Sequence, residues 1–454
     1  MTKQSKRFPL VAMMLTLALG ISTTGCEDED NVHTLGNWVN LDTNLPGTPR
    51  GGAVCFQIER NGEQIAYIGT GANTANTEER ERFRDFFQVT PDRKGGITYS
   101  GKWINSGEGV SSMPDNAPQR NGAVAFTLNG KGYVGLGYTG TRYLNDFWEF
   151  DPAGVPDSAQ YNLSEDDPFF GVDTDGDGVK ENSYGSYKTY KSTYSQMTDE
   201  ARENFAKNQT GKWTRVANFP GDTCRYAVAF VLHSNTDNKD YAYVGTGEDG
   251  ESNYLSDFFR FDGKDWKRVT NCKMPRAQAS VFTMTINGTN YAYLVGGVNS
   301  GAVATLERFN GDEISDNGQI GVWEQLNKTK DATRETFDDD YTGLAAYGAT
   351  SFVLPDRQKA YITTGGQGSA GKLTWEYDPI GDYWVQKTSF EGAARRFAVS
   401  FVFKQLNPKT GIEQYIPYVT TGTDVALTTT ATGGYFYSDT WFFNPYQGWD
   451  SHDN

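Results

Sequence analysis

One pattern of residues recurs six times along the chain and constrains the fold more than any other feature. The full pattern reads as an Arg, a run of Ala, Val and Phe, a Tyr-rich run that ends in glycines, an Asp among aromatics, and a Trp, and the fifth copy lacks the Arg. The clearest copy starts at Arg120, passes through residues 133–137 and 145–151, and ends at Trp213. Four strand-like pieces in about 50 residues are typical of one blade of a β-propeller. The pattern therefore predicts an all-β chain with six blades.

The six copies also predict how the ring of blades closes. They start at Arg50, Arg120, Arg225, Arg276, at the Arg-less positions Ala346 or Tyr347, and at Arg396, and they end at Trp103, Trp213, Trp266, Trp323, Trp384 and Trp449. Trp38 precedes any first strand, so we expect residues 38–41 to supply the last strand of the sixth blade and remove a free edge. Small residues suit the innermost strands, and glycines suit the sharp turn after the second strand.

The pattern resembles the kelch repeat over residues 38–450. This resemblance implies a six-bladed kelch-type β-propeller of the galactose-oxidase-like kind, with an N-terminal strand that closes the last blade. A copper site is not expected, because the chain has only three histidines and two of them, His33 and His452, lie in terminal tails.

The N-terminus has the features of a secretion signal. Lys3, Lys6 and Arg7 precede an apolar run over residues 10–21, which is too short for a comfortable membrane span. The run ends before Cys26, and residues 23–26 resemble a bacterial lipobox, so residues 1–25 are predicted to be a lipoprotein signal peptide. The resemblance implies that Cys26 carries acyl chains such as palmitate and becomes the first mature residue.

The segment after Cys26 gives information about the cellular location of the protein. Residues 26–37 form an acidic linker, and residues 27–30 resemble the export tag of Bacteroidota-type surface lipoproteins; a solvated linker is the alternative. We expect an outer-membrane lipoprotein that contacts the membrane through its lipid alone. Whether it faces the periplasm or the cell exterior stays open.

A long insert interrupts the second copy at residues 152–210, and it contains an acidic loop. Asp173, Asp175, Asp177, the carbonyl of Val179 and Glu181 have the spacing of oxygen ligands for calcium. The loop resembles those of thrombospondin type 3 repeats and dockerins, and an acidic solvated turn is the alternative. We expect calcium to order the insert.

The repeated arginines are the second candidate site. Arg50, Arg120, Arg225, Arg276 and Arg396 are expected to occupy one point of the repeat and to ring one mouth of the central channel. The resemblance to kelch domains that bind acidic peptides or sugars implies an anion-binding ring. In the alternative, each Arg ties together neighbouring segments of the propeller.

Three cysteines remain after Cys26. We expect Cys55 to be a small buried residue. Cys224 and Cys272 precede the Arg of successive copies, so a disulfide between them is possible.

The net charge and the absence of common catalytic sequence motifs limit the classes of function that we expect. The net charge of −16 disfavours a nucleic-acid partner. The chain has no Gly-x-Ser-x-Gly, His-Glu-x-x-His or phosphate-loop motif. We therefore expect a monomeric, envelope-anchored binding or scaffolding module for a protein or glycan rather than an enzyme. The alternative is a carbohydrate-active propeller, such as a sugar mutarotase or a lyase-like enzyme, which should have a deep channel mouth with a carboxylate of perturbed pKa near the arginines.

Overall fold

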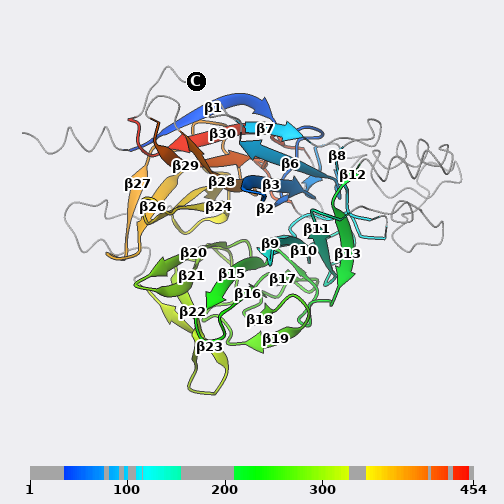
Figure 1. The fold of residues 1–454 in the computed structure, drawn as a ribbon, viewed down its shortest axis with the longest axis vertical. Coiled ribbons are helices and arrows are strands. Elements are labelled where there is room, and N and C mark those ends of the chain that lie inside the picture. The colour runs from blue at the N-terminus through cyan, green and yellow to red at the C-terminus, as the bar shows by residue number, and fades with distance from the viewer. Residues whose placement is uncertain are drawn as a thin grey trace, which may run out of the picture.

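The computed structural model describes residues 35–75, 81–91, 97–100, 109–114, 116–154, 209–326, 344–406, 411–427 and 433–448. These residues form six four-stranded antiparallel sheets, which follow one another around a common centre (Figure 1). The innermost strands β2, β9, β15, β20, β24 and β28 surround that centre, and each contacts the next in a closed circle. The prediction of an all-β, six-bladed propeller is confirmed.

In the first three blades, the strands follow one another in chain order from the innermost to the outermost. Blade one contains β2 (Val54–Arg60), β3 (Glu63–Gly69), β6 (Phe86–Pro91) and β7 (Ile97–Ser100). Blade two contains β9 (Val124–Leu128), β10 (Lys131–Gly135), β11 (Phe147–Asp151) and β13 (Lys212–Val216). Blade three contains β15 (Val228–Ser234), β16 (Lys239–Gly245), β18 (Phe258–Phe261) and β19 (Trp266–Val269).

Blades four and five repeat this order, and the N-terminal strand is the outermost strand of blade six. Blade four contains β20 (Ser280–Ile286), β21 (Thr289–Val295), β22 (Leu306–Ile314) and β23 (Ile320–Gln325). Blade five contains β24 (Tyr347–Leu354), β25 (Lys359–Gly366), β26 (Thr374–Asp378) and β27 (Tyr383–Lys387). Blade six contains β28 (Val399–Leu406), β29 (Glu413–Thr420), β30 (Asp439–Asn444) and β1 (Asn37–Asn44).

Short strands lie in the connections. β4 (Ala72–Asn73) pairs with β5 (Glu81–Arg82), and β14 (Cys224–Arg225) pairs with β17 (Glu248–Asp249). β8 (Gly109–Val110) pairs in parallel with β12 (Gln209–Thr210), which ties the end of the insert to the connection before blade two. Cys26 and the predicted calcium loop, residues 173–181, lie outside the described residues. Among the described residues, no helix is long and apolar enough to cross a membrane.

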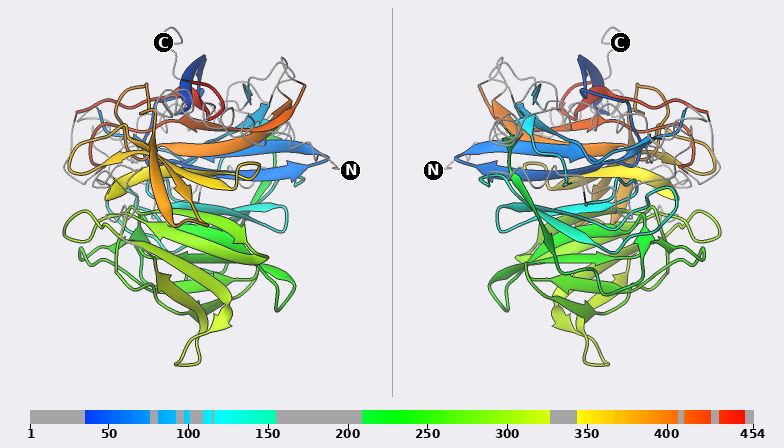
Figure 2. Two further views of the ribbon diagram at one scale, coloured as in Figure 1. Left: turned by 90° about the vertical axis from the view of Figure 1, so that its left-hand side faces the viewer. Right: turned by 90° about the vertical axis from the view of Figure 1, so that its right-hand side faces the viewer.

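The N-terminal strand closes the ring, as predicted. β1 pairs antiparallel with β30, with Trp38 opposite Phe443 (Figures 1 and 2). Trp38 is fully buried, packs edge-on against Phe390, and donates its indole N–H to the carbonyl of Thr388 in the linker from blade five. In blade one the fourth strand differs from the prediction. Tyr99, opposite Val89, occupies the register position that a Trp occupies in the fourth strands of the other blades. Trp103 and Trp449, the predicted ends of the first and sixth copies, lie outside the described residues.

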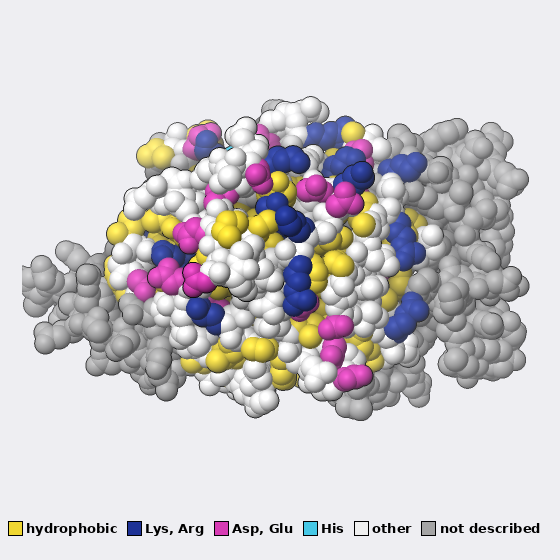
Figure 3. Space-filling view, turned by 90° about the horizontal axis from the view of Figure 1, so that it is seen from below, with side chains coloured by type: hydrophobic (Ala, Val, Ile, Leu, Met, Phe, Trp, Pro, Cys, Tyr) yellow, Lys and Arg dark blue, Asp and Glu magenta, His cyan; other side chains and the backbone are white. Residues whose placement is uncertain are grey.

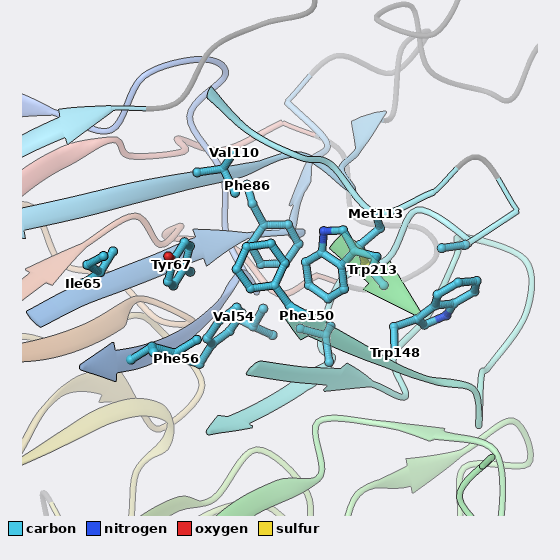
Figure 4. Packing of buried hydrophobic residues seen from close by; sticks show 13 residues of the cluster. Val54, Phe56, Ile65, Tyr67, Phe86, Val110, Met113, Trp148, Phe150 and Trp213 are labelled. Atoms are coloured by element: carbon cyan, nitrogen blue, oxygen red, sulfur yellow. The ribbon is translucent and has the colours of Figure 1, made fainter. Parts of the chain in front are cut away.

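Aromatic rings fill the space between the blades. In every blade a Phe of the innermost strand stacks on a Tyr of the second strand at 5.1–5.2 Å between ring centroids, in the pairs Phe56–Tyr67, Phe126–Tyr133, Phe230–Tyr243, Phe282–Tyr293, Phe352–Tyr361 and Phe401–Tyr418. Figure 4 shows Phe150 of blade two against the first of these pairs, and Trp213 against Phe86 and Phe150. Offset stacking favours one rotamer of each ring, so the repeat specifies the packing as well as the strands.

We expect Trp38→Ala to lower the free energy of unfolding by about 3–5 kcal/mol, because a fully buried indole is replaced by a cavity at the ring closure. Trp266→Ala, at the same place in blade three but partly exposed, should cost less. Urea unfolding followed by fluorescence measures both variants. Equal losses would show that closure by β1 adds nothing beyond the packing of one aromatic side chain.

Candidate binding face at the channel mouth

Backbone hydrogen bonds between blades fix the true register of the repeat. In each blade a glycine after the second strand donates its N–H to one carbonyl of the next blade. The residues that accept define the clamp position: Arg50, Arg120, Cys224, Arg276, Ala346 and Arg395. Arg225 and Arg396 are therefore one residue later than Arg50, Arg120 and Arg276. The expectation that the five arginines occupy one point of the repeat is wrong.

An arginine at the clamp position holds three segments of its own blade together. Arg120 is fully buried and donates to the carbonyls of Pro118 at 3.0 Å and Leu136 at 3.1 Å, and both its terminal nitrogens bind Asp146 at 2.7–2.8 Å. Burial by itself raises the pKa of Asp146, but the adjacent guanidinium holds it below the ordinary value. The same pattern joins Arg50 to Asp85, Arg276 to Glu307 and Arg395 to Asp439.

Blade three keeps the acid of this clamp but not the arginine. Cys224 takes the arginine's place, and Asp257 occupies the position of Asp85 and Asp146 without a guanidinium partner at the clamp position. Burial raises the pKa of Asp257 and outweighs a backbone hydrogen bond and the nearby Arg268, which lower it, while Asp222 adds to the rise. Cys224 is a free, buried thiol, as is Cys272, so the possible disulfide between them is not formed. Cys55 is free as well and lies partly buried against the core between blades one and six.

The next residue in each blade defines the mouth position: Gly51, Asn121, Arg225, Ala277, Tyr347 and Arg396. Arg225 is nearly buried and binds Glu248 at 2.6 Å. Its guanidinium lies 5.0 Å from the ring centroid of Tyr138, and the guanidinium of Arg82 lies 5.1 Å from the same ring. Arg82 also donates to Asn121 at 2.6 Å. Blades one to three thus place two cations, one carboxylate and the ring of Tyr138 side by side.

The residue after that defines the circle position: Gly52, Gly122, Tyr226, Gln278, Gly348 and Phe397. All six have φ between 56° and 68°, and each donates its backbone N–H to the carbonyl of the preceding member, so that six hydrogen bonds close on themselves around the axis. The left-handed conformation favours glycine, and a side chain there costs about 1 kcal/mol or more. Three blades nevertheless have a residue with a side chain at this position. Tyr226, Gln278 and Phe397 therefore lie at the centre of the mouth.

Two of these side chains, with one loop residue, fill the mouth. Tyr226 and Phe397, from opposite blades, stack at 5.0 Å between centroids. Leu427, in the connection between β29 and β30, is buried beside them, and its carbonyl accepts from Arg225 at 2.9 Å and Tyr226 at 3.2 Å. A side chain at Gly52 or Gly122 would collide with Leu427 or Tyr226. The channel therefore ends in a shallow aromatic face rather than a deep mouth.

The opposite end of the channel is more open. A hollow of about 370 Å³ lies there between blades three, four and five. His233, Thr283 and Gln358 are among the residues that line it, and none of its lining residues is acidic. This hollow therefore lacks the carboxylate that an acid–base reaction on a sugar would use.

The sequence analysis missed Arg82, Tyr138 and Leu427 because they lie outside the six-fold pattern. A topological signal was present, however. Residues between the glycines after the second strand and the aspartate before the third strand lie at the same end of a blade as the entry to its first strand. Side chains of that connection had to lie near the arginines.

These features define the class of protein: a six-bladed β-propeller whose channel is closed at one end by aromatic side chains. No protein-family model matches the chain, and no curated protein matches it. Among solved structures that do match, one titled "Structure of YjhT" is 12% identical, with a TM-score of 0.49, over 87% of this chain and 95% of that one. At this level of similarity the match says nothing about function, and the kelch type remains a resemblance.

We expect Asp146→Asn to lower the free energy of unfolding by about 3–5 kcal/mol, because the Arg120 guanidinium would stay buried without its counter-charge. Asp257→Asn, at the same repeat position without an arginine, should leave stability at pH 7 unchanged or higher. Urea midpoints at pH 7 test both. Equal destabilisation would contradict the assignment of Asp257 as an unpaired acid.

The two aspartates should also respond oppositely to pH. The folded pKa of Asp146 is lowered, so its contribution is present above about pH 4 and is lost as the pH falls further. The folded pKa of Asp257 is raised, so ionisation of Asp257 weakens the folded state as the pH rises through that value. As the pH rises from about 3 to 7, the wild type should therefore gain stability relative to Asp146→Asn and lose stability relative to Asp257→Asn, and urea midpoints measured across this range check both signs.

Proposed function

We propose that this chain is a binding or scaffolding module of the cell envelope that engages a protein or glycan partner at the mouth face, defined by Arg82, Tyr138, Arg225, Tyr347, Arg396 and Tyr435. The observation that carries the proposal is the closed mouth. Tyr226, Phe397 and Leu427 fill the position where a catalytic propeller would need a cavity. Of the residues that define this face, Tyr435 is exposed and Tyr347 is partly exposed, whereas Arg82, Tyr138, Arg225 and Arg396 are buried. Tyrosine is one of the residue types that are enriched in binding hot spots.

The carboxylates do not favour the enzymatic alternative. Glu248, beside the mouth, is bound to Arg225. Asp257, whose pKa is raised, occupies a clamp site between strands rather than the mouth position. A mutarotase or lyase-like enzyme would need an acid or base that faces a bound sugar. In the described part of the mouth, Glu248 is bound to Arg225 and so does not meet this requirement.

The surface charge is mixed despite the net negative charge. On the face that Figure 3 shows, described basic side chains lie among acidic and apolar ones, without an extended basic patch. Nucleic acid therefore remains a disfavoured partner, since its binding depends on many phosphate contacts. Monomeric state and calcium binding by residues 173–181 remain predictions.

The direction of β1 determines at which end of the propeller a lipid anchor on Cys26 would attach. Asn44 pairs with Asp439, which binds Arg395 at the mouth end, and Asn37 pairs with Asn444 at the opposite end. A lipid on Cys26 would therefore attach to the end away from the mouth through 11 residues, which span at most about 40 Å. In this arrangement the attachment point and the mouth face lie at opposite ends of the propeller, so the tether itself does not cover the mouth face.

Replacement of exposed Tyr435 should weaken partner binding. Tyr435 is 73% exposed at the mouth end, and Tyr446 is 44% exposed at the opposite end. We expect Tyr435→Ala to weaken binding of a glycan-array hit at least tenfold, and Tyr446→Ala to leave it unchanged. A photo-crosslinker at each position, used in intact envelopes, applies the same comparison to protein partners. Dependence on Tyr446 alone, or mutarotation of the bound sugar, would refute the proposal.

The lipid anchor has a separate test. We expect Cys26→Ala to move the protein from the membrane fraction to the soluble fraction, because acylation requires the thiol. Fractionation followed by immunoblotting measures the shift, and Cys55→Ala serves as the matched control. A membrane fraction that is unchanged in Cys26→Ala would rule out anchoring at this residue.

A further inference from the structure

Arg396 differs from the other buried arginines of the described repeat positions in having no acidic partner. It is 2% exposed, and its single side-chain hydrogen bond runs from Nη2 to the carbonyl of Gly368 at 2.7 Å. Its Nε is buried and has no partner. Its neighbour Arg395, equally buried, binds Asp439 with both terminal nitrogens at 2.7–2.8 Å. One of two consecutive arginines is therefore neutralised and the other is not.

A buried guanidinium without a counter-charge is costly, because its desolvation is not offset by an ion pair. The clamp arginines avoid this cost through Asp85, Asp146, Glu307 and Asp439, and Arg225 avoids it through Glu248. Arg396 meets only a carbonyl and the ring of Tyr347, whose centroid is 5.2 Å from the guanidinium carbon. Neither supplies a negative charge.

We propose that Arg396 is an anion subsite that takes one carboxylate group of the ligand. The inference rests on the proposed function in that it assigns the ligand of the mouth face. The uncompensated charge is +1, which a monoanionic carboxylate neutralises, whereas a sulfate or phosphate dianion would leave a buried negative charge. A planar carboxylate also matches the planar fork of a guanidinium whose face is stacked on a ring.

A carboxylate would reach Arg396 from the exposed connection between β25 and β26. The carbonyl that caps Arg396 belongs to the connection between β25 and β26, and residues 367–369 of that connection are exposed. Gly366 and Gly368 stand on either side of Gln367, so the backbone next to the capping carbonyl has few side chains. A carboxylate that displaces the Gly368 carbonyl would exchange a neutral acceptor for a charged one, and charge-assisted hydrogen bonds are roughly twice as strong.

The test uses the whole protein and sodium acetate as the probe, with sodium chloride and sodium sulfate at matched ionic strength. We expect 100 mM acetate to raise the unfolding temperature of the wild type by about 2–4 °C over chloride, as for a ligand bound tenfold above its Kd. Arg396→Met should lose this response, and Arg396→Lys, which keeps the charge without the fork, should show a smaller one.

Arg395→Met is the matched control. It should lower the unfolding temperature by several degrees in every salt, whereas Arg396→Met in chloride should stay within about 2 °C of the wild type or exceed it. An equal acetate response in wild type and Arg396→Met, a response to sulfate alone, or a loss of stability in Arg396→Met as large as that in Arg395→Met would overturn the assignment. No macromolecular partner takes part in this experiment. The acetate test of Arg396 can therefore fail while the Tyr435→Ala test of the proposed function succeeds, and the Tyr435→Ala test can fail while the acetate test succeeds.

Discussion

Six backbone hydrogen bonds around the axis, from one circle position to the next, hold the rest of this structure in register. Each requires a left-handed residue, and the circle closes only when all six blades contribute. This requirement fixes the entry to every innermost strand. The clamp arginines then tie that entry to the second and third strands of the same blade through Arg50, Arg120, Arg276 and Arg395. The mouth position lies between these two constraints, so its side chains are held on a rigid frame.

Because the backbone is the same in all six blades, the side chains that differ between the blades determine the shape of the mouth. Glycine at 52, 122 and 348 leaves space, and Tyr226 and Phe397 on opposite blades use that space to meet across the axis. Had all six circle residues been glycine, the channel would open at this end. Had all six been aromatic, the rings would collide. The mixture of glycines and large residues therefore closes the mouth without disturbing the hydrogen bonds around the axis.

The fold could be predicted because each strand carries its own repeated signal, and ring closure could be predicted because Trp38 repeats the fourth-strand signal out of place. The register of the arginines could not be predicted as easily. Arg395 and Arg396 are adjacent, and Arg225 stands beside Cys224, so a search for Arg alone finds the wrong member. The spacing to the following Ala does distinguish them: three residues for Arg120, two for Arg225 and Arg396. Leu427 lay beyond prediction because a connection of its length has many conformations with similar energies.

The one-residue shift also explains where unpaired charges remain. In blade three the clamp position holds a thiol and the arginine moves to the mouth, which leaves Asp257 without its partner. In blade six the clamp position keeps Arg395 and the mouth gains a second arginine, which leaves Arg396 without an acid. Neither group is needed for the repeat, since blade five does without both arginine and acid at the clamp position, where Ala346 stands. A buried charge that lacks a partner and that the scaffold does not need lowers stability, so selection for binding rather than for folding is the simplest explanation for Arg396 at the mouth position.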